Sequence, residues 1–173
     1  MRRLAYAGLM IAAGITGAYS ESIPNFELLT LIAFASGVLL GPRDGAGVAA
    51  LTMLIYSLLN PYGAAHPLVT AAQVAGEALA GLTGGWSASL AQRPPAWRAI
   101  VLGAIGAGLT AVYDLLTNVA SGLVYGQMRA VLIGGIPFAL WHIGTNVGLF
   151  AVIGTALLGV LVRYRERLAP VPH

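Results

Sequence analysis

Six apolar segments account for most of this chain, and short stretches rich in glycine, proline and polar residues separate them. Of its 173 residues, 58% are hydrophobic and only 9% are charged, whereas soluble domains carry about 25% charged residues. A soluble fold with this composition would lack the polar residues needed to cover its surface. The chain is therefore predicted to be an all-α integral membrane protein. We expect one membrane domain, residues 1–173, with six transmembrane helices at about 4–20, 26–40, 46–59, 68–90, 99–122 and 132–162.

The first segment resembles a signal peptide, because Arg2 and Arg3 precede an apolar stretch that ends in small residues. Nothing downstream looks like an exported soluble domain, so residues 4–19 are better interpreted as a first membrane helix. The second and third segments, at 26–40 and 46–59, are shorter than the roughly 20 residues that span a bilayer. We expect these two helices to be less tilted, broken or extended into their loops.

The positive charge of the chain comes entirely from arginine and is unequally distributed along it. If the N-terminus is cytoplasmic, eight of the nine arginines fall on the cytoplasmic side and only Arg129 falls outside. The eight are Arg2, Arg3, Arg43, Arg93, Arg98, Arg163, Arg165 and Arg167. Cytoplasmic loops carry an excess of basic residues, so both termini are predicted to be cytoplasmic. The net charge of +3 thus indicates topology and not a nucleic-acid-binding surface.

Three segments carry a pair of polar residues four positions apart. The pairs are Gln73 and Glu77, Asp114 and Asn118, and His142 and Asn146. Residues i and i+4 share a helix face, and the predicted topology places all three pairs in the outer half of the membrane. Ionisable side chains within membrane helices cost about 2.5–3.5 kcal/mol on insertion scales and usually face a cavity or one another. We therefore predict one polar pocket, open to the outside, between the last three helices.

Five further polar or aromatic residues are candidates on the outer side. Glu27 lies at the start of the second segment, Asn60, Tyr62 and His66 lie between the third and fourth, and Trp141 precedes His142. Structural roles are alternatives for several candidates: Tyr62 and Trp141 could belong to an interfacial aromatic belt, and the asparagines could join helices. His142 could hydrogen-bond a neighbouring carbonyl group. For Glu77 and Asp114, a functional role is favoured over packing.

Several classes of chemistry have no signature in this chain. Cysteine is absent, which excludes disulfides, thiolate metal sites and a cysteine nucleophile. The sequence contains no Walker A motif, no HExxH zinc motif and no serine in a nucleophile elbow. The inner halves of the segments offer no ionisable relay for a proton-driven carrier. The pattern favours a protein without cofactor or metal that captures a small molecule and obtains energy from other proteins.

The stretch IPNFELLTLIAFASGVLLGPRDGAGVAALTMLIYSLLNPYG at 23–63 resembles the substrate-binding S components of energy-coupling factor (ECF) transporters. The resemblance rests on the Pro-Asn-x-Glu element at 24–27, a short Gly-Pro turn and the Asn-Pro-Tyr-Gly element at 60–63. The size, the six helices and the cytoplasmic termini are also similar. The resemblance implies a non-enzymatic subunit of a prokaryotic cytoplasmic membrane that binds a vitamin or related micronutrient. It also implies a transmembrane coupling subunit and two cytoplasmic ATPases as partners.

Carried over by position, the resemblance implies substrate-site roles for Asn25, Glu27, Asn60 and Tyr62. It also implies that small residues of the first helix meet the coupling subunit. Two small-xxx-small pairs supply candidates for this contact: Gly8 with Ala12, and Ala13 with Gly17.

The charges of the predicted pocket bear on its ligand. Three carboxylates, Glu27, Glu77 and Asp114, face His66, His142 and Arg129, so a neutral or cationic ligand is favoured over biotin, pantothenate or folate. Cobalamin-, thiamine- or pyridoxine-like compounds and deazapurines fit this condition, although protonation of one carboxyl would weaken the argument. Two alternatives stay open: a stand-alone secondary carrier, and an intramembrane enzyme that uses Glu77, Asp114 and His142.

Overall fold

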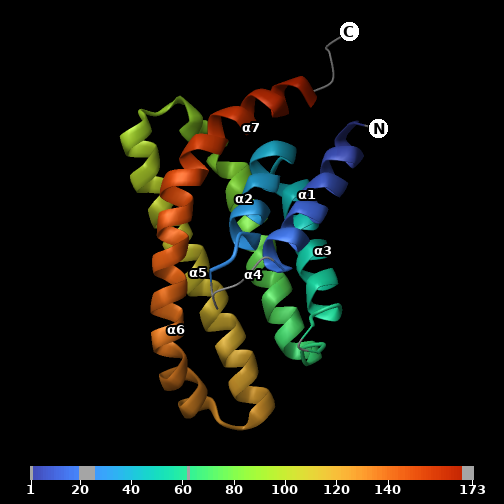
Figure 1. Ribbon diagram of the computed structural model, residues 1–173, viewed down its shortest axis with the longest axis vertical. Coiled ribbons are helices and arrows are strands. Elements are labelled where there is room, and N and C mark those ends of the chain that lie inside the picture. Colours follow the sequence, from blue (N-terminus) through green and yellow to red (C-terminus); the bar gives the residue numbers. More distant parts are fainter. Residues whose placement is uncertain (1, 20–25, 62, 169–173) are drawn as a thin grey trace.

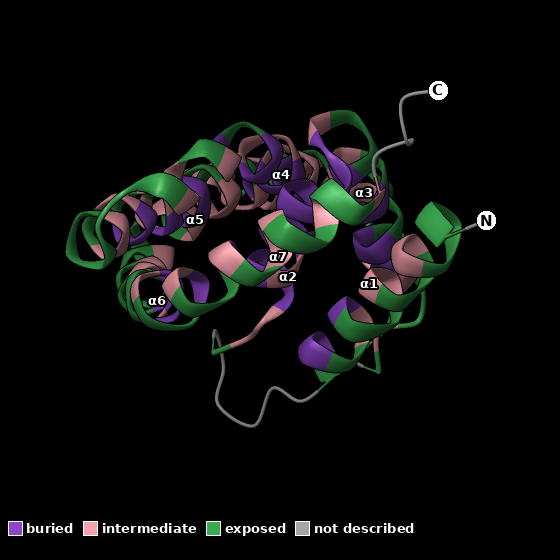
Figure 2. Ribbon diagram, turned by 90° about the horizontal axis from the view of Figure 1, so that it is seen from above, coloured by how far each residue is buried: buried purple, intermediate pink, exposed green. Residues whose placement is uncertain are grey.

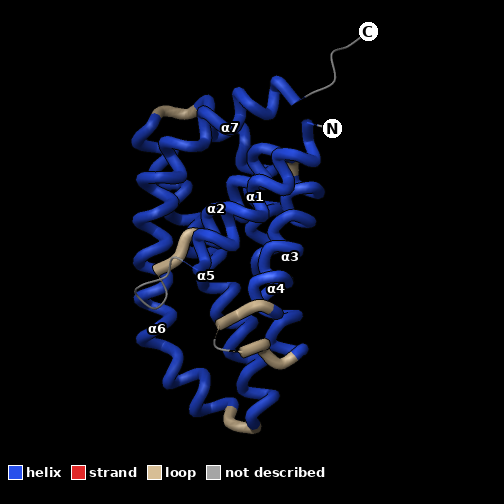
Figure 3. Tube along the Cα trace, turned by 45° about the vertical axis from the view of Figure 1, so that its right-hand side comes forward, coloured by secondary structure: helices blue, strands red, loops and turns tan. Residues whose placement is uncertain are grey.

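The computed structural model describes residues 2–19, 26–61 and 63–168, and nearly all of them are helical (Figures 1 and 3). The elements are α1 (Arg2–Tyr19), α2 (Leu29–Leu40), α3 (Pro42–Leu58), α4 (Pro67–Trp86), the 3₁₀ helix η1 (Ser87–Gln92), α5 (Pro95–Tyr125), α6 (Met128–Leu149), the π-helical turn η2 (Phe150–Gly154) and α7 (Thr155–Leu168). Because α6, η2 and α7 are continuous, the described chain contains the six helical segments that the sequence predicts. The π-helical turn was not predicted; such turns are inserted into α-helices at irregular, often functional, places.

Several helices begin earlier than the sequence analysis predicted, and in α3 and α5 a proline marks the new start. The turn expected at 41–45 is reduced to Gly41, whose φ of +94° lies in the left-handed region that glycine tolerates. Pro42 then occupies the first turn of α3, where a missing N–H costs nothing because that group has no partner inside the helix. Pro95 starts α5 in the same way, four residues before the predicted boundary at 99.

Helix α2 is the central element of the bundle. Eleven of its twelve residues are buried, and it contacts α1, α3, α4 and α7. Its Phe34 ring meets Phe150 edge-on, with 5.2 Å between the ring centroids. With twelve residues the helix is only about 18 Å long, too short to cross a bilayer unaided. The short second segment of the sequence is therefore a buried core helix.

Glycines allow α2 and α4 to touch backbone to backbone. A Cβ atom added at Gly37 would lie 1.8 Å from the carbonyl oxygen of Gly81, and one added at Gly84 would lie 1.9 Å from that of Phe34. Real Cβ atoms essentially never approach another heavy atom so closely. The glycines therefore fix how near α4 comes to α2, and with it the position of the polar residues that α4 carries.

Helices α5 and α6 form a long antiparallel pair beside the other helices (Figure 1). Pro95–Tyr125 and Met128–Leu168 are long and apolar enough to cross a membrane, yet only 28% of the most apolar stretch of each is buried. Figure 2 shows exposed residues along the outward faces of both helices. Apolar side chains such as Leu123, Phe138 and Leu140 are more than 60% exposed. A surface of this kind suits lipid and not water.

Helix α1 begins and α7 ends at the same end of the bundle, where α2 gives way to α3 (Figure 1). Arg165 of α7 donates from Nη1 to the carbonyl oxygens of Val38 (3.5 Å) and Gly85 (3.4 Å). Arg3 donates from Nη2 to Leu40 O and to Asp44 Oδ2, at 2.6 Å each. These bonds satisfy carbonyl groups that helix ends leave without an internal partner. We call this the arginine end; α6, which carries Arg129 in its first turn, begins at the opposite end.

Candidate functional site

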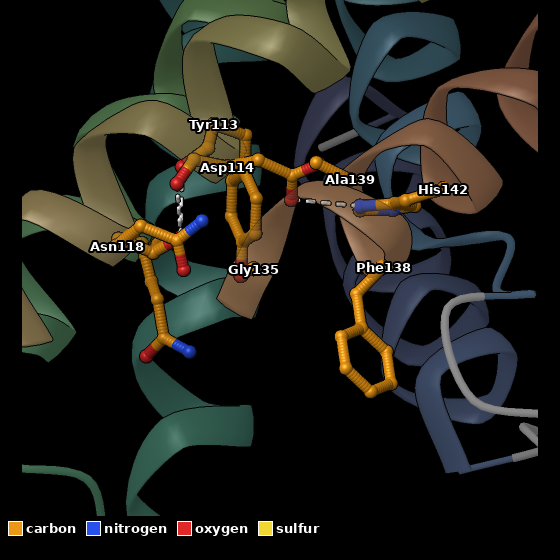
Figure 4. Close-up of a pocket in the computed structure, with 9 residues that line it drawn as sticks. Tyr113, Asp114, Asn118, Gly135, Phe138, Ala139 and His142 are labelled. Atoms are coloured by element: carbon orange, nitrogen blue, oxygen red, sulfur yellow. Dashed lines mark hydrogen bonds and ion pairs between the residues drawn. The ribbon is translucent and has the colours of Figure 1, made fainter. Parts of the chain in front are cut away.

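A cavity of about 490 Å³ lies between α4, α5 and α6 (Figure 4). Four of the predicted site residues line it: Gln73 from α4, Asp114 and Asn118 from α5, and His142 from α6. The two α5 residues are four positions apart and lie on one helix face, as their spacing predicted. At least one residue of each predicted polar pair therefore lines the cavity.

A small residue on α6 makes room for the amide of Asn118. A Cβ atom at Gly135 would lie 2.8 Å from Asn118 Nδ2, so a larger residue there would displace this side chain. Phe138 follows Gly135 by three positions and precedes His142 by four, and all three line the cavity. The α6 side of the cavity is therefore formed by one face of the helix, which presents Gly135, Phe138 and His142 in that order.

Asp114 and His142 are in contact on the cavity wall, drawn as a dashed line in Figure 4. His142 Nδ1 lies 2.9 Å from Asp114 Oδ1, and the two side chains are only 6% and 16% exposed. The ring of Tyr113 stands edge-on to the imidazole, with 6.2 Å between centroids and an interplanar angle of 86°. The imidazole is thus held on two sides, which fixes the direction in which it can meet a ligand.

Glu27 links the start of α2 to His142. Its carboxylate accepts hydrogen bonds from the backbone N–H groups of Leu29 and Thr30, the latter at 3.2 Å, and so caps α2. A carboxylate at this place also interacts favourably with the positive end of the helix dipole. Glu27 Oε1 lies 3.7 Å from His142 Nε2. The charge at the start of an apolar helix is therefore both a cap and a contact to α6.

Thr30 extends this chain of polar groups into the core. Its Oγ1 lies 2.9 Å from Glu27 Oε1 and 2.9 Å from Glu77 Oε1. Glu77 is on α4 and is only 2% exposed. A continuous series of contacts therefore runs from Asp114 at the cavity through His142, Glu27 and Thr30 to Glu77. We call these five residues the polar chain.

Two members of the predicted polar pairs lie away from the cavity surface. Glu77 is reached only through Thr30, as described above. Asn146 is fully buried one turn beyond His142, and its Nδ2 donates to the carbonyl oxygen of His142 at 3.3 Å. The i, i+4 spacing predicted the shared face correctly but not the depth of each residue below the cavity.

The other predicted residues lie elsewhere. His66 Nδ1 accepts from the N–H of Leu68 at 3.2 Å, so this side chain caps α4. Asn60 accepts a backbone hydrogen bond from Gly63 in the loop after α3, and Trp141 is 52% exposed. None of these three lines the cavity. Asn25 and Tyr62 lie outside the described residues.

Among the residues that contribute to the site and that the sequence analysis missed are Thr30, Phe138 and Tyr113. Thr30 follows Glu27 by three positions and Phe138 precedes His142 by four, so helical spacing could have indicated both. Tyr113 is adjacent to Asp114 in sequence, and its contact with His142 depends on how α5 packs against α6. No sequence signal predicts that contact.

The small residues predicted on the first helix do not share one face. Gly8, Ala12 and Ala13 are exposed, and a Cβ atom at Gly8 would meet nothing within 4 Å. Gly17 is buried, and a Cβ atom there would lie 3.1 Å from side-chain atoms of Leu28 and Ile32. A mainly apolar groove of about 540 Å³ runs beside Gly8 between α1 and α3.

Comparison with known proteins gives one match. The family model of the ECF transporter, substrate-specific component, matches residues 2–154. No curated protein and no solved structure showed significant similarity to the chain. The matched region contains α1–α6 and the turn η2, and so includes the whole cavity and the polar chain. The chain belongs to the family of substrate-specific components of ECF transporters.

Proposed function

We propose that the cavity between α4, α5 and α6 is the substrate site of this S component, and that it captures a vitamin or related micronutrient from outside the cell. The observation that carries this proposal is the Asp114–His142 pair, a mostly buried carboxyl–imidazole contact on the wall of a cavity of about 490 Å³. Ligand sites have volumes of about 300–1,000 Å³ and contain a few placed polar groups among apolar ones. Ionisable groups in a membrane protein are expensive and usually serve a function.

The charges near the cavity favour a neutral or cationic ligand. The polar chain contains three carboxyl groups and one imidazole, and no arginine lines the cavity. An anionic ligand would meet like charge there, whereas an amine or a protonated heterocycle would find Asp114 at the wall. Tyr113 and Phe138 supply aromatic surface for a flat ring. A thiamine- or pyridoxine-like compound suits this volume better than the much larger cobalamin.

The partner proteins implied by the family are a transmembrane coupling subunit and two cytoplasmic ATPases, which would supply the energy for uptake. We assign the contact with the coupling subunit to the groove between α1 and α3, together with the exposed Gly8, Ala12 and Ala13. Small exposed residues allow another helix to approach closely in a membrane. The arginine end would face the cytoplasm, in agreement with the excess of basic residues on cytoplasmic sides.

The two alternatives have less support. Among the described residues there is no group of three or more His, Asp or Glu side chains that could hold a metal ion, which argues against a metal-dependent intramembrane enzyme. The polar chain ends at Glu77 in the core and does not continue along the described helices to the arginine end. A proton-driven carrier would need such a continuation.

Mass spectrometry of the purified protein under native conditions tests the proposal, because a tightly bound ligand copurifies. With that ligand identified, we expect Asp114→Asn to weaken binding at least tenfold, which corresponds to about 1.4 kcal/mol. Asp44→Asn is the matched control, since Asp44 is exposed and pairs with Arg3 at the arginine end. Unchanged affinity in Asp114→Asn would remove the cavity as the substrate site. Uptake by this chain alone in proteoliposomes, driven by an ion gradient, would favour the secondary carrier.

A further inference from the structure

The carboxyl group of Glu77 is in an unusual position for a charge. The residue is 2% exposed, Oε1 contacts Thr30, and Oε2 has no hydrogen-bond partner. In the described part of the chain, no arginine or histidine forms an ion pair with it. An ionised carboxylate buried without a partner is so costly that such groups usually become neutral.

The hydroxyl group of Thr30 gives independent information about the protonation of Glu27 and Glu77. Its oxygen lies 2.9 Å from a carboxyl oxygen of Glu27 and 2.9 Å from one of Glu77, which are hydrogen-bond distances. A hydroxyl group has one hydrogen to donate, and an ionised carboxylate can only accept. Both contacts are full two-centre hydrogen bonds only if one of the two carboxyl groups carries a proton and donates it to Thr30 Oγ1.

The surroundings of the two carboxyl groups differ, and this identifies the protonated one. Glu27 accepts the N–H groups of Leu29 and Thr30 at the positive end of α2 and faces His142 Nε2, so its oxygens already act as acceptors among these groups. Among the described residues, Glu77 has no such donor besides the Thr30 contact. The proton therefore belongs on Glu77.

The other ionisable groups around Glu77 are few. They are Glu27 before α2, Tyr113 and Asp114 on α5, and His142 on α6. The described charged residues of α1 and α3 are in their first turns, and those of α7 are in its last turns, so all of them belong to the arginine end. No cation in these elements replaces the proton.

We propose that Glu77 is a proton-binding site of this protein: its O–H group donates to Thr30 Oγ1, and the Thr30 O–H group donates to Glu27 Oε1. The proton joins α4 to the start of α2 without leaving a second buried anion. The polar chain connects this site to the cavity through His142. If the cavity holds a cationic ligand, as proposed above, the ligand's charge would favour loss of the proton, so capture would be linked to proton release; this link rests on the proposed function.

Infrared spectroscopy of the purified protein, after any copurified ligand has been removed, tests the site itself. The chain contains only six Asp and Glu residues, so the carbonyl stretch of a neutral carboxylic acid can be assigned by substitution. At neutral pH we expect one such band, sensitive to exchange into D₂O. It should be absent in Glu77→Gln, whose amide can still donate to Thr30, and unchanged in the control Asp44→Asn. In Thr30→Val the band should persist but move to higher frequency, because its hydrogen bond is lost.

Absence of the band in the wild-type protein, or its persistence in Glu77→Gln, would overturn the proton site. Should Glu77→Gln fail to fold, the band of Thr30→Val decides, since an unshifted frequency would show that the neutral acid does not contact Thr30. Failure of the proton site leaves the cavity intact as the proposed substrate site, because the Asp114→Asn experiment tests that proposal separately.

Discussion

The contact between α2 and α4 can be tested by adding a single methyl group. Gly37 of α2 faces the backbone of α4, and a Cβ atom there would lie 1.8 Å from Gly81 O. Gly37→Ala therefore forces the two backbones apart until this separation reaches the 3.4 Å of ordinary van der Waals contact. Neither group is the end of a flexible side chain, so a rotamer change cannot relieve the collision.

The expected cost follows from two opposing effects. Overpacking a well-packed core costs about 1–3 kcal/mol, and a backbone-to-backbone collision belongs at the upper end, about 3 kcal/mol. Alanine is favoured over glycine in a helix by about 1 kcal/mol, which leaves a net destabilisation of about 2 kcal/mol. Gly47→Ala on α3 is the matched control, because a Cβ atom at Gly47 meets nothing within 4 Å. It should gain about 1 kcal/mol, so the two variants should differ by about 3 kcal/mol.

Reversible unfolding of the detergent-solubilised protein with increasing mole fraction of sodium dodecyl sulfate, followed by circular dichroism, measures this difference. Equal stability of Gly37→Ala and Gly47→Ala would refute the argument that the glycines set the distance between α2 and α4. A destabilised Gly37→Ala that also loses its copurifying ligand would show that this distance positions the α4 side of the cavity.

Two further predictions concern α1 and the arginine end. Ala12→Trp should impair assembly with the coupling subunit in a pull-down assay while ligand binding is retained; Ala111→Trp, at an exposed position of α5, is the control, and normal assembly of Ala12→Trp would exclude this face. Arg165→Gln removes a cation from the carboxyl ends of α2 and α4 and should lower the free energy of unfolding by about 1 kcal/mol. The same change at the exposed Arg163 should have little effect, and equal losses would show that the contacts of Arg165 are not stabilising.

Local sequence patterns predicted the helical segments and part of the site. Composition indicated a membrane protein, and turn residues separated the six segments in the right order. The spacing of Asp114 and Asn118 placed both on the face of α5 that lines the cavity. These features depend on the chemistry of the chain within a few residues, which is why the sequence suffices for them.

Other assignments depended on packing between distant segments. His66 caps its own helix and Trp141 is largely exposed, although both are near the predicted site in sequence. Helical spacing states which residues share a face, but the neighbouring helix that this face meets depends on interhelical distances and angles. In this protein those are set in part by glycines at which α2 and α4 touch.

Glu27 shows most clearly the difference between what local sequence patterns determine and what tertiary packing determines. The sequence by itself determined that a carboxylate stands at the start of an apolar helix, within an element typical of S components, but left open whether it binds ligand or holds a loop. The tertiary structure decided that it caps α2, faces His142 and shares the hydroxyl group of Thr30 with Glu77. Residues 27, 77 and 142 are far apart in the chain. Only the close approach of α2, α4 and α6 brings these three side chains into one polar chain.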